Sequence, residues 1–204
     1  DVKLTVEQAQ TYVKDATDLS FNMISVDGDT STNDCVFLMA NGASGVALTT
    51  GEDVAKFRKA LNEVAQVLAQ AIAIDGEGAT KLIEVTLTGA PEVAMARKAA
   101  RGITISPLIK SAMHGEDPNW GRILARLGAE GVPAAILEKM DLRMQGKLLF
   151  ENGAPVAFNR DEARQTLKAN KIEVEISLKS GNVDVTAWGC DLSKKYVDIN
   201  AEYS

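Results

Sequence analysis

The polar stretch Asp27–Asp34, with the sequence DGDTSTND, lies between two apolar segments of the chain. Phe21–Val26 precedes it and Cys35–Ala40 follows it, and we predict that both segments form strands, the second one buried. Aspartate and asparagine favour turns, and Gly28 permits a positive φ. The stretch is therefore predicted to be a loop held between two strands, a position where functional side chains concentrate.

Three interpretations of this loop compete. Asp27, Asp29 and Ser31 match the start of a calcium-binding EF-hand loop. However, Thr32 replaces the required glycine and Leu38 occupies the position of the bidentate glutamate, so we predict no metal site. Asp27 and Asp29 also resemble the nucleophile and proton shuttle of a Mg²⁺-dependent, haloacid-dehalogenase-like phosphatase, although no second acidic metal-binding motif follows. In the third interpretation the loop is structural and shapes the core beside a site formed elsewhere.

The composition limits the class of protein. The chain has 204 residues, 46% hydrophobic and 25% charged, which fits a globular protein of one or two domains. A formal net charge of −6 argues against a nucleic-acid-binding surface, and no apolar stretch reaches membrane-spanning length. Cys35 and Cys190 are predicted to be buried free thiols, consistent with a cytoplasmic protein. The sequence starts at Asp1 with neither an initiator methionine nor a signal peptide, and we interpret it as part of a longer protein, either a processed chain or a segment cut for expression.

Hydrophobic periodicity predicts the secondary structure. Helical spacing and capping signals predict helices at residues 6–18, 51–74, 92–101, 103–113, 123–127 and 159–168, of which 103–113 is a helix or a helix–strand mixture. Apolar runs predict strands at residues 21–26, 35–40, 83–87, 148–150, 156–158, 172–178, 183–188 and 197–201, with a hairpin turn at 151–153. The predicted class is α+β, with mixed sheets packed against helices. We divide the chain into a helix and strand region, residues 1–140, and a strand-rich region, residues 141–204.

Glu77 and Asn200 are ambiguous from their local sequence alone. Glu77 stands between Gly76 and Gly78 in the loop Asp75–Thr80, where small neighbours let a ligand approach the backbone closely. Its carboxylate could hold a substrate ammonium, or it could be a turn residue in water. Asn200 lies in the predicted last strand, where it would ordinarily be a solvated edge residue.

The second polar loop offers weaker candidates. His114 is the only histidine, and neither a nucleophile elbow nor a cluster of zinc ligands accompanies it. We therefore predict that His114 packs in a loop or lies at the surface. Trp120 and Arg122 could bind an anion, but a packed tryptophan and a capping arginine at a helix start are favoured.

Four motifs together resemble a known family. They are Ser25–Asp34, Asp75–Thr80, Asp117–Ile123, and Trp188–Leu192 with Asn200–Tyr203. In this order, and over nearly the whole chain, they resemble ornithine acetyltransferase. That enzyme of arginine biosynthesis moves the acetyl group of N-acetylornithine to glutamate.

The resemblance implies that the chain is the β chain of a precursor that cleaves itself before a threonine. That threonine, the family's nucleophile, is expected upstream of Asp1, and a further threonine or serine is expected one position beyond Ser204. No catalytic residue is then expected within this chain, whereas Glu77 and Asn200 are implied to bind substrate. The oxyanion hole, a threonine and a lysine belong to the α chain, with which an α₂β₂ heterotetramer is expected.

The resemblance implies no cofactor, with acetyl-CoA as a co-substrate only if the enzyme is bifunctional. It also implies an ornithine acetyltransferase-like fold with the processing of an N-terminal nucleophile. Two alternatives stay open at this point. One is the phosphatase-like hydrolase that uses Asp27 and Asp29, and the other is a non-catalytic subunit.

Overall fold

The computed structural model describes residues 1–202, which form two compact units. The first unit comprises Asp1–Asn22 and Thr30–Ala69, and the second comprises Met23–Asp29 and the chain from Gln70 onward. The boundary that we predicted between residues 140 and 141 lies inside the second unit. The predicted α+β class is confirmed, with a single mixed sheet among the described residues.

The first unit contains helix α1 (Val6–Asp18) and most of helix α2 (Gly51–Ile74). The predicted capping box at the start of α1 is present, because Thr5 and Gln8 each accept a hydrogen bond from the other's backbone N–H. The rings of Tyr12 and Phe57 lie 5.5 Å apart between their centroids, so aromatic packing joins α1 to α2. Both helices were predicted from their periodicity.

The prediction of a buried strand at Cys35–Ala40 is wrong. The segment has no regular secondary structure, and Val36, Phe37 and Met39 are 43%, 80% and 89% exposed. Within residues 1–202, no backbone–backbone hydrogen bond involves this segment. A strand needs a neighbouring edge for its ladder, and the described chain supplies none here, although the composition favours one. Cys35 is accordingly exposed, not buried as predicted.

The second unit is built on a mixed seven-stranded sheet in the order β1-β7-β2-β6-β3-β4-β5. Its strands are β1 (Ile24–Ser25), β2 (Leu82–Ala90), β3 (Asp141–Met144), β4 (Lys147–Glu151), β5 (Ala154–Pro155), β6 (Lys171–Ser177) and β7 (Val183–Cys190). The pairs β1–β7 and β2–β6 are parallel, and the other neighbours are antiparallel. The predicted hairpin at 151–153 joins β4 to β5, although β5 ends before the strand predicted at 156–158. Residues 21–26 also differ from prediction, since the 3₁₀ helix η1 (Phe21–Met23) leaves only a short β1.

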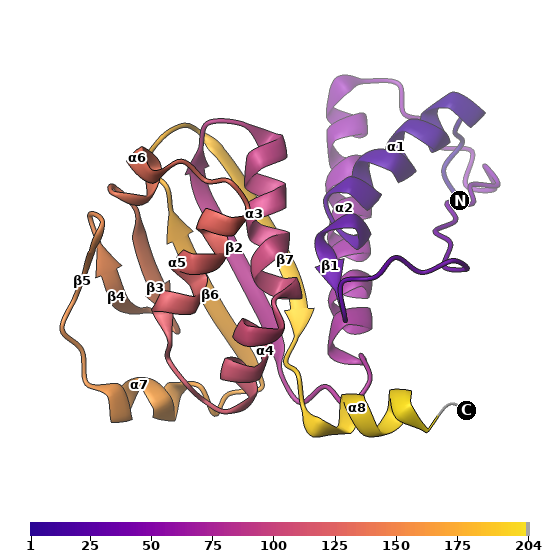
Figure 1. The fold of residues 1–204 in the computed structure, drawn as a ribbon. Helices are drawn as coiled ribbons and strands as arrows, with labels where there is room; N and C mark the ends of the chain where they lie inside the picture. The colour runs from indigo at the N-terminus through magenta and orange to yellow at the C-terminus, as the bar shows by residue number, and fades with distance from the viewer. Residues whose placement is uncertain (203–204) are drawn as a thin grey trace. The chain divides into compact units, whose positions relative to one another are not determined.

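Helices cover one face of this sheet (Figure 1). They are α3 (Val93–Ile105), α4 (Pro107–His114) and α5 (Trp120–Ala129), and the remaining helices are α6 (Ala134–Leu137), α7 (Arg160–Thr166) and α8 (Lys194–Ala201). Ser106 separates α3 from α4 and caps α4, which resolves the predicted helix or helix–strand mixture at 103–113. Side chains of β6 alternate, with Ile172, Val174 and Ile176 buried and Lys171, Glu173 and Glu175 exposed. The core therefore lies between the sheet and the α3–α5 layer.

The prediction of a last strand at 197–201 is wrong, because these residues form helix α8. The alternation of Val197, Ile199 and Ala201 suggested a strand. Within α8 the half-buried side chains are instead those of Tyr196 and Ile199, at the spacing i, i+3 of one helix face. Asn200 therefore lies on a helix, where its side-chain Nδ2 donates to the carbonyl of Tyr196 at 3.0 Å.

Candidate substrate-binding site

The loop that carries Glu77 connects α2 to β2 and lies against the start of α8. A Cβ atom on Gly78 would lie 2.7 Å from Cβ of Lys195 and 2.8 Å from the backbone nitrogen of Tyr196. Gly78 also has a φ of +69°, which L side chains rarely adopt. The contact between the loop and α8 therefore requires glycine at this position.

Asp191, directly after β7, anchors the same loop from inside the protein. Its side chain is fully buried. One carboxylate oxygen accepts from the backbone N–H groups of Thr80 and Lys81 at 2.7 and 2.8 Å. The other accepts from the Thr80 hydroxyl at 2.6 Å and lies 2.7 Å from Nδ1 of His114.

Hydrogen bonding keeps this buried carboxylate ionised. Burial by itself raises the pKa of Asp191, but the hydrogen bonds from Thr80, His114 and Lys81 outweigh it and hold the pKa below its ordinary value. An ionised carboxylate with every nearby donor satisfied is a rigid attachment point. The chain around Thr80 is therefore fixed to the end of β7.

Ser193 forms the link from this anchor to α8. Its hydroxyl donates to the carbonyl of Gly78 at 2.6 Å, and α8 begins at the next residue. Asp191 and Ser193 thus tie the Glu77 loop to the helix that carries Asn200. The structure brings the elements of the two predicted substrate-binding residues together, although they are 123 positions apart in the sequence.

The neighbourhood of Tyr196 is acidic. The Tyr196 hydroxyl donates to the carboxylate of Asp27 at 3.3 Å. The pKa of Tyr196 is raised, first by burial, then by the carboxylate of Asp27 and by the charges of Glu77 and Asp29. Three carboxylates thus act on Tyr196, and the cation Lys195 lies beside them against Gly78.

The loop Asp27–Asp34 binds largely to itself. The Asp27 carboxylate accepts from the backbone N–H of Asp29 at 2.9 Å, and the Ser31 hydroxyl accepts from those of Asn33 and Asp34, each at 3.2 Å. No group of three potential metal-ligating side chains occurs among residues 1–202. These turn-type hydrogen bonds fit the structural interpretation of the loop.

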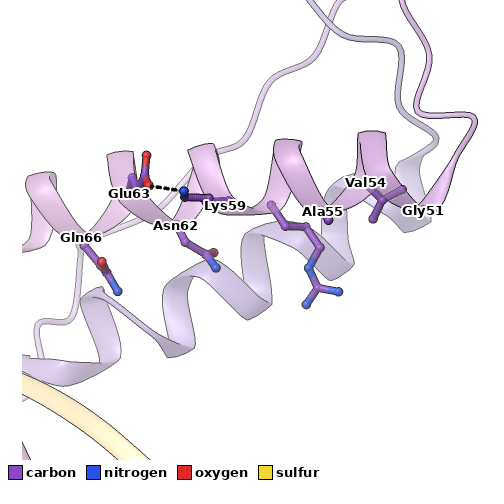
Figure 2. A pocket seen from close by; sticks show the side chains of 8 residues that line it. Gly51, Val54, Ala55, Lys59, Asn62, Glu63 and Gln66 are labelled. Atoms are coloured by element: carbon purple, nitrogen blue, oxygen red, sulfur yellow. Dashed lines mark ion pairs between the residues drawn. The ribbon is translucent and has the colours of Figure 1, made fainter.

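Glu77 and Asn200 are both exposed in this chain. The groove shown in Figure 2 belongs to the first unit, has a volume of about 660 Å³ and is lined by Gly51, Val54, Ala55, Arg58, Lys59, Asn62, Glu63 and Gln66. None of the predicted site residues lines it. Its charged residues are paired, Arg58 with Asp15 at 2.6 Å and Lys59 with Glu63 at 3.9 Å. We therefore do not assign the substrate-binding site to this groove.

The other candidates have structural roles. The Thr80 hydroxyl donates to Asp191 and not to His114, so this trio is not a nucleophile with its base. Trp120 stacks on Phe150 with ring centroids 5.2 Å apart, and Arg122 donates to the carbonyl of Leu108 at 2.6 Å. The packed tryptophan was the favoured prediction for Trp120, and a loop-packing or surface histidine was predicted for His114. Arg122 was predicted to cap a helix start but instead donates to α4.

Two buried polar residues were not predicted as part of the site. Asp191 appeared in the sequence analysis only as part of the motif Trp188–Leu192, which carries the family resemblance. The neighbouring sequence does not show which groups a buried carboxylate binds. Lys110, also buried, donates to the carbonyl of Val26 and lies 3.7 Å from Sγ of Cys190. Cys190 is a buried free thiol, as predicted, and burial raises its pKa.

Comparisons with known proteins agree over the whole chain. The sequence profile of the ArgJ family matches residues 1–204. A glutamate N-acetyltransferase from Methanopyrus kandleri is 43% identical over 208 residues, covering 100% of this chain and 53% of that protein. The arginine biosynthesis bifunctional protein ArgJ from Bacillus licheniformis is 44% identical over 196 residues, covering 95% of this chain and 48% of that protein.

A solved structure matches as well. The crystal structure of the arginine biosynthesis bifunctional protein ArgJ from Bacillus halodurans superimposes with a TM-score of 0.94 at 42% identity, covering 100% of this chain and 96% of that chain. The α+β fold of this chain is thus the fold of a solved ArgJ structure. The chain belongs to the ArgJ family. It spans about half the length of the full-length relatives that it matches.

Proposed function

We propose that this chain is one of two chains of an enzyme that moves an acetyl group from N-acetylornithine to glutamate. The observation that carries this proposal is the match along all 204 residues, at 43% identity, to a protein named glutamate N-acetyltransferase. The site adds a physical reason. Glu77 stands on an anchored loop beside further carboxylates, where it would pair with the ammonium of N-acetylornithine. Asn200 would make a second substrate contact from α8.

The chemistry of transfer is assigned to groups outside the 204 residues. A threonine upstream of Asp1, at the N-terminus of the complete β chain, would attack the acetyl carbonyl with its hydroxyl, and its own α-amino group would take the proton. The amide C–N bond then breaks, ornithine leaves with the proton, and an acetyl-threonine ester remains for glutamate to attack. Donors of the α chain would stabilise the tetrahedral oxyanion in both steps. Glu77 and Asn200 would orient the substrate and take no proton.

The partner is proposed to be the α chain of the same precursor, in an α₂β₂ heterotetramer. This chain covers about half of the Methanopyrus and Bacillus licheniformis proteins but 96% of the Bacillus halodurans chain, so chains of both lengths occur in the family. Exposed apolar side chains are a second observation that supports a partner chain. They are exposed on the Cys35–Ala40 segment and also along α2, at Val64, Val67, Leu68, Ile72 and Ile74.

The remaining assignments follow from this proposal. We propose a cytoplasmic location, because the thiols Cys35 and Cys190 are free. No helix of the described chain combines the length and the apolar character needed to cross a membrane. No cofactor is proposed, and acetyl-CoA is a second acetyl donor if the enzyme is bifunctional. The phosphatase alternative is disfavoured, since the Asp27 carboxylate is already engaged by Asp29 and Tyr196.

Acetyl transfer is expected only when both halves are present. The purified 204-residue chain should convert no N-acetylornithine and glutamate to ornithine and N-acetylglutamate, whereas the product of the full-length gene should do so. Mass spectrometry of the products checks this, and adding acetyl-CoA with glutamate alone tests for the bifunctional case. Robust transfer by the isolated chain, or none by the assembled protein, would contradict the proposal. The mass and N-terminal sequence of the native protein would show whether a cut threonine precedes Asp1.

Polar substitution in the Cys35–Ala40 segment is expected to weaken assembly. Phe37 and Met39 are the most exposed apolar side chains of this segment, at 80% and 89%. Burial of such side chains stabilises an interface by about 1.5–3 kcal/mol each. Phe37→Ser with Met39→Ser should therefore reduce recovery of the α chain with a tagged β chain more than about 10-fold.

Val6→Ser is the matched control, since Val6 is 76% exposed in the same unit but lies outside the segment. It should leave recovery unchanged. Light scattering of the co-purified protein then distinguishes an α₂β₂ heterotetramer from a heterodimer. Equal recovery for the double variant and the control would show that this segment does not contact the α chain.

A further inference from the structure

His114 completes the set of hydrogen bonds around Asp191. It is the last residue of α4, and its Nδ1 lies 2.7 Å from the Asp191 oxygen that also accepts from the Thr80 hydroxyl. The His114 side chain is 39% exposed, whereas that of Asp191 is fully buried. His114 is therefore the solvent-side member of a chain of contacts that leads to the Glu77 loop.

Contacts with Lys81 in turn hold the end of α4, and therefore His114, in place. Lys81, next to Thr80, donates from Nζ to the carbonyls of Met113 at 3.1 Å and Leu167 at 2.6 Å. Lys81 thus holds the last turn of α4, directly before His114. The backbone N–H of Asp191 donates to the carbonyl of Lys81 at 3.1 Å. Hydrogen bonds therefore connect the end of α4, the start of β2 and the end of β7 to one another.

We propose that His114 is a positioning residue for the substrate-binding loop, acting through Asp191 and Thr80 on the placement of Glu77. This proposal rests on the proposed function, in which Glu77 pairs with the substrate ammonium. Thr80 is three residues from Glu77, and the loop between them is a turn in which the Ala79 N–H donates to the carbonyl of Gly76 at 2.9 Å. Its placement depends on external attachments, which are Asp191 at Thr80 and Ser193 at Gly78.

Loss of the His114 donor would weaken one of these attachments. The shared Asp191 oxygen would keep only the Thr80 hydroxyl as a donor. A displacement of about 1 Å in a substrate-positioning group can reduce a rate about 100-fold. His114 touches no substrate in this scheme, so its effect passes through Glu77.

Two substitutions separate positioning from folding. His114→Leu removes the donor, and His114→Asn keeps an N–H group, since Nδ2 of asparagine takes the place of Nδ1. In the assembled enzyme, His114→Leu should raise KM for N-acetylornithine about 10-fold and His114→Asn less than about 3-fold. KM for glutamate should stay within about 2-fold in both, because glutamate has no second amine for Glu77 to bind.

Thr80→Val provides a second variant in case His114→Leu does not fold. It removes the hydroxyl donor to the same oxygen but keeps the backbone N–H, and it should also raise KM for N-acetylornithine about 10-fold. The proposal is overturned if the folded variants keep the wild-type KM. It is equally overturned if asparagine raises KM as much as leucine, or if both substrates are affected equally. Glu77→Gln, measured in parallel, tests the proposed function by itself, since an effect there without one at His114 rejects only the positioning role.

Discussion

Replacing Asp191 with alanine should lower the free energy of unfolding of the second unit by about 3–5 kcal/mol, the cost of removing one partner from a buried charged network. The Asp191 side chain is fully buried and accepts from two backbone N–H groups, the Thr80 hydroxyl and His114. Alanine leaves these donors without an acceptor, at about 1–3 kcal/mol for each one that water cannot reach. Asp191→Asn keeps one oxygen and should cost about 1–3 kcal/mol.

Urea unfolding followed by tryptophan fluorescence measures this effect in the correct unit. Both tryptophans, Trp120 and Trp188, belong to the second unit, so the signal reports its unfolding. Asp184→Ala is the matched control, because Asp184 lies on β7, the strand that Asp191 follows, and accepts one backbone N–H, from Gly89 at 3.0 Å, but is exposed. It should cause a much smaller change. Similar losses at both positions would mean that the buried network has no special contribution.

The same carboxylate predicts a dependence of stability on pH. The pKa of Asp191 is lower in the folded chain than its ordinary value of 3.8, so below that value the unfolded chain binds more protons. The stability that Asp191 contributes is therefore complete above about pH 4 and is lost as the pH falls through the folded pKa. Asp191→Asn does not titrate and should show a shallower loss as the pH falls below about 4. An unchanged slope would show that other carboxyl groups cause the acid sensitivity.

The features that the sequence predicted correctly depend on contacts that are close in sequence. Patterns of residues that are close in sequence define three of them: the capping box at Thr5, the periodic helix α2 and the alternating strand β6. The Asp191 network could not be predicted in this way, because Thr80 lies 111 positions from Asp191 and any acidic residue after a strand looks alike. The strand prediction at Cys35–Ala40 failed although the local preference for a strand is clear. A strand also needs a neighbouring strand to pair with, and the described chain supplies none there.

The assignment of Glu77 and Asn200 to a substrate-binding site stays a prediction. Glu77 and Asn200 were chosen through the resemblance to a family, because their local sequence left both ambiguous. The structure then showed their elements in contact through Ser193 and Gly78. That contact depends on helix α8, which three alternating apolar residues had suggested was a strand. A segment this short cannot distinguish the two periods without knowing which side chains are buried.

Substitution of Glu77 by glutamine should raise KM for N-acetylornithine about 10- to 100-fold in the assembled enzyme. Glutamine keeps the size and shape of the side chain and removes its charge. A charged hydrogen bond shielded from water is worth about 1.5–3 kcal/mol, whereas a fully solvated ion pair is worth about 0–1 kcal/mol. Glu77 is exposed in this chain, so the larger effect requires that the α chain and the substrate cover it. The size of the change therefore reports whether the site is completed by the partner.

Steady-state kinetics with each substrate varied in turn measures this effect. KM for glutamate should change little, and self-cleavage of the precursor should proceed normally, because neither process involves the ammonium of N-acetylornithine. Glu175→Gln is the control, since Glu175 is exposed on the uncovered face of β6 and should keep wild-type kinetics. An increase of no more than about 5-fold would match a solvated pair and place Glu77 outside the covered site. No change in KM or kcat would leave Glu77 as a turn residue, because an ammonium-binding carboxylate cannot lose its charge without weakening the substrate that it holds.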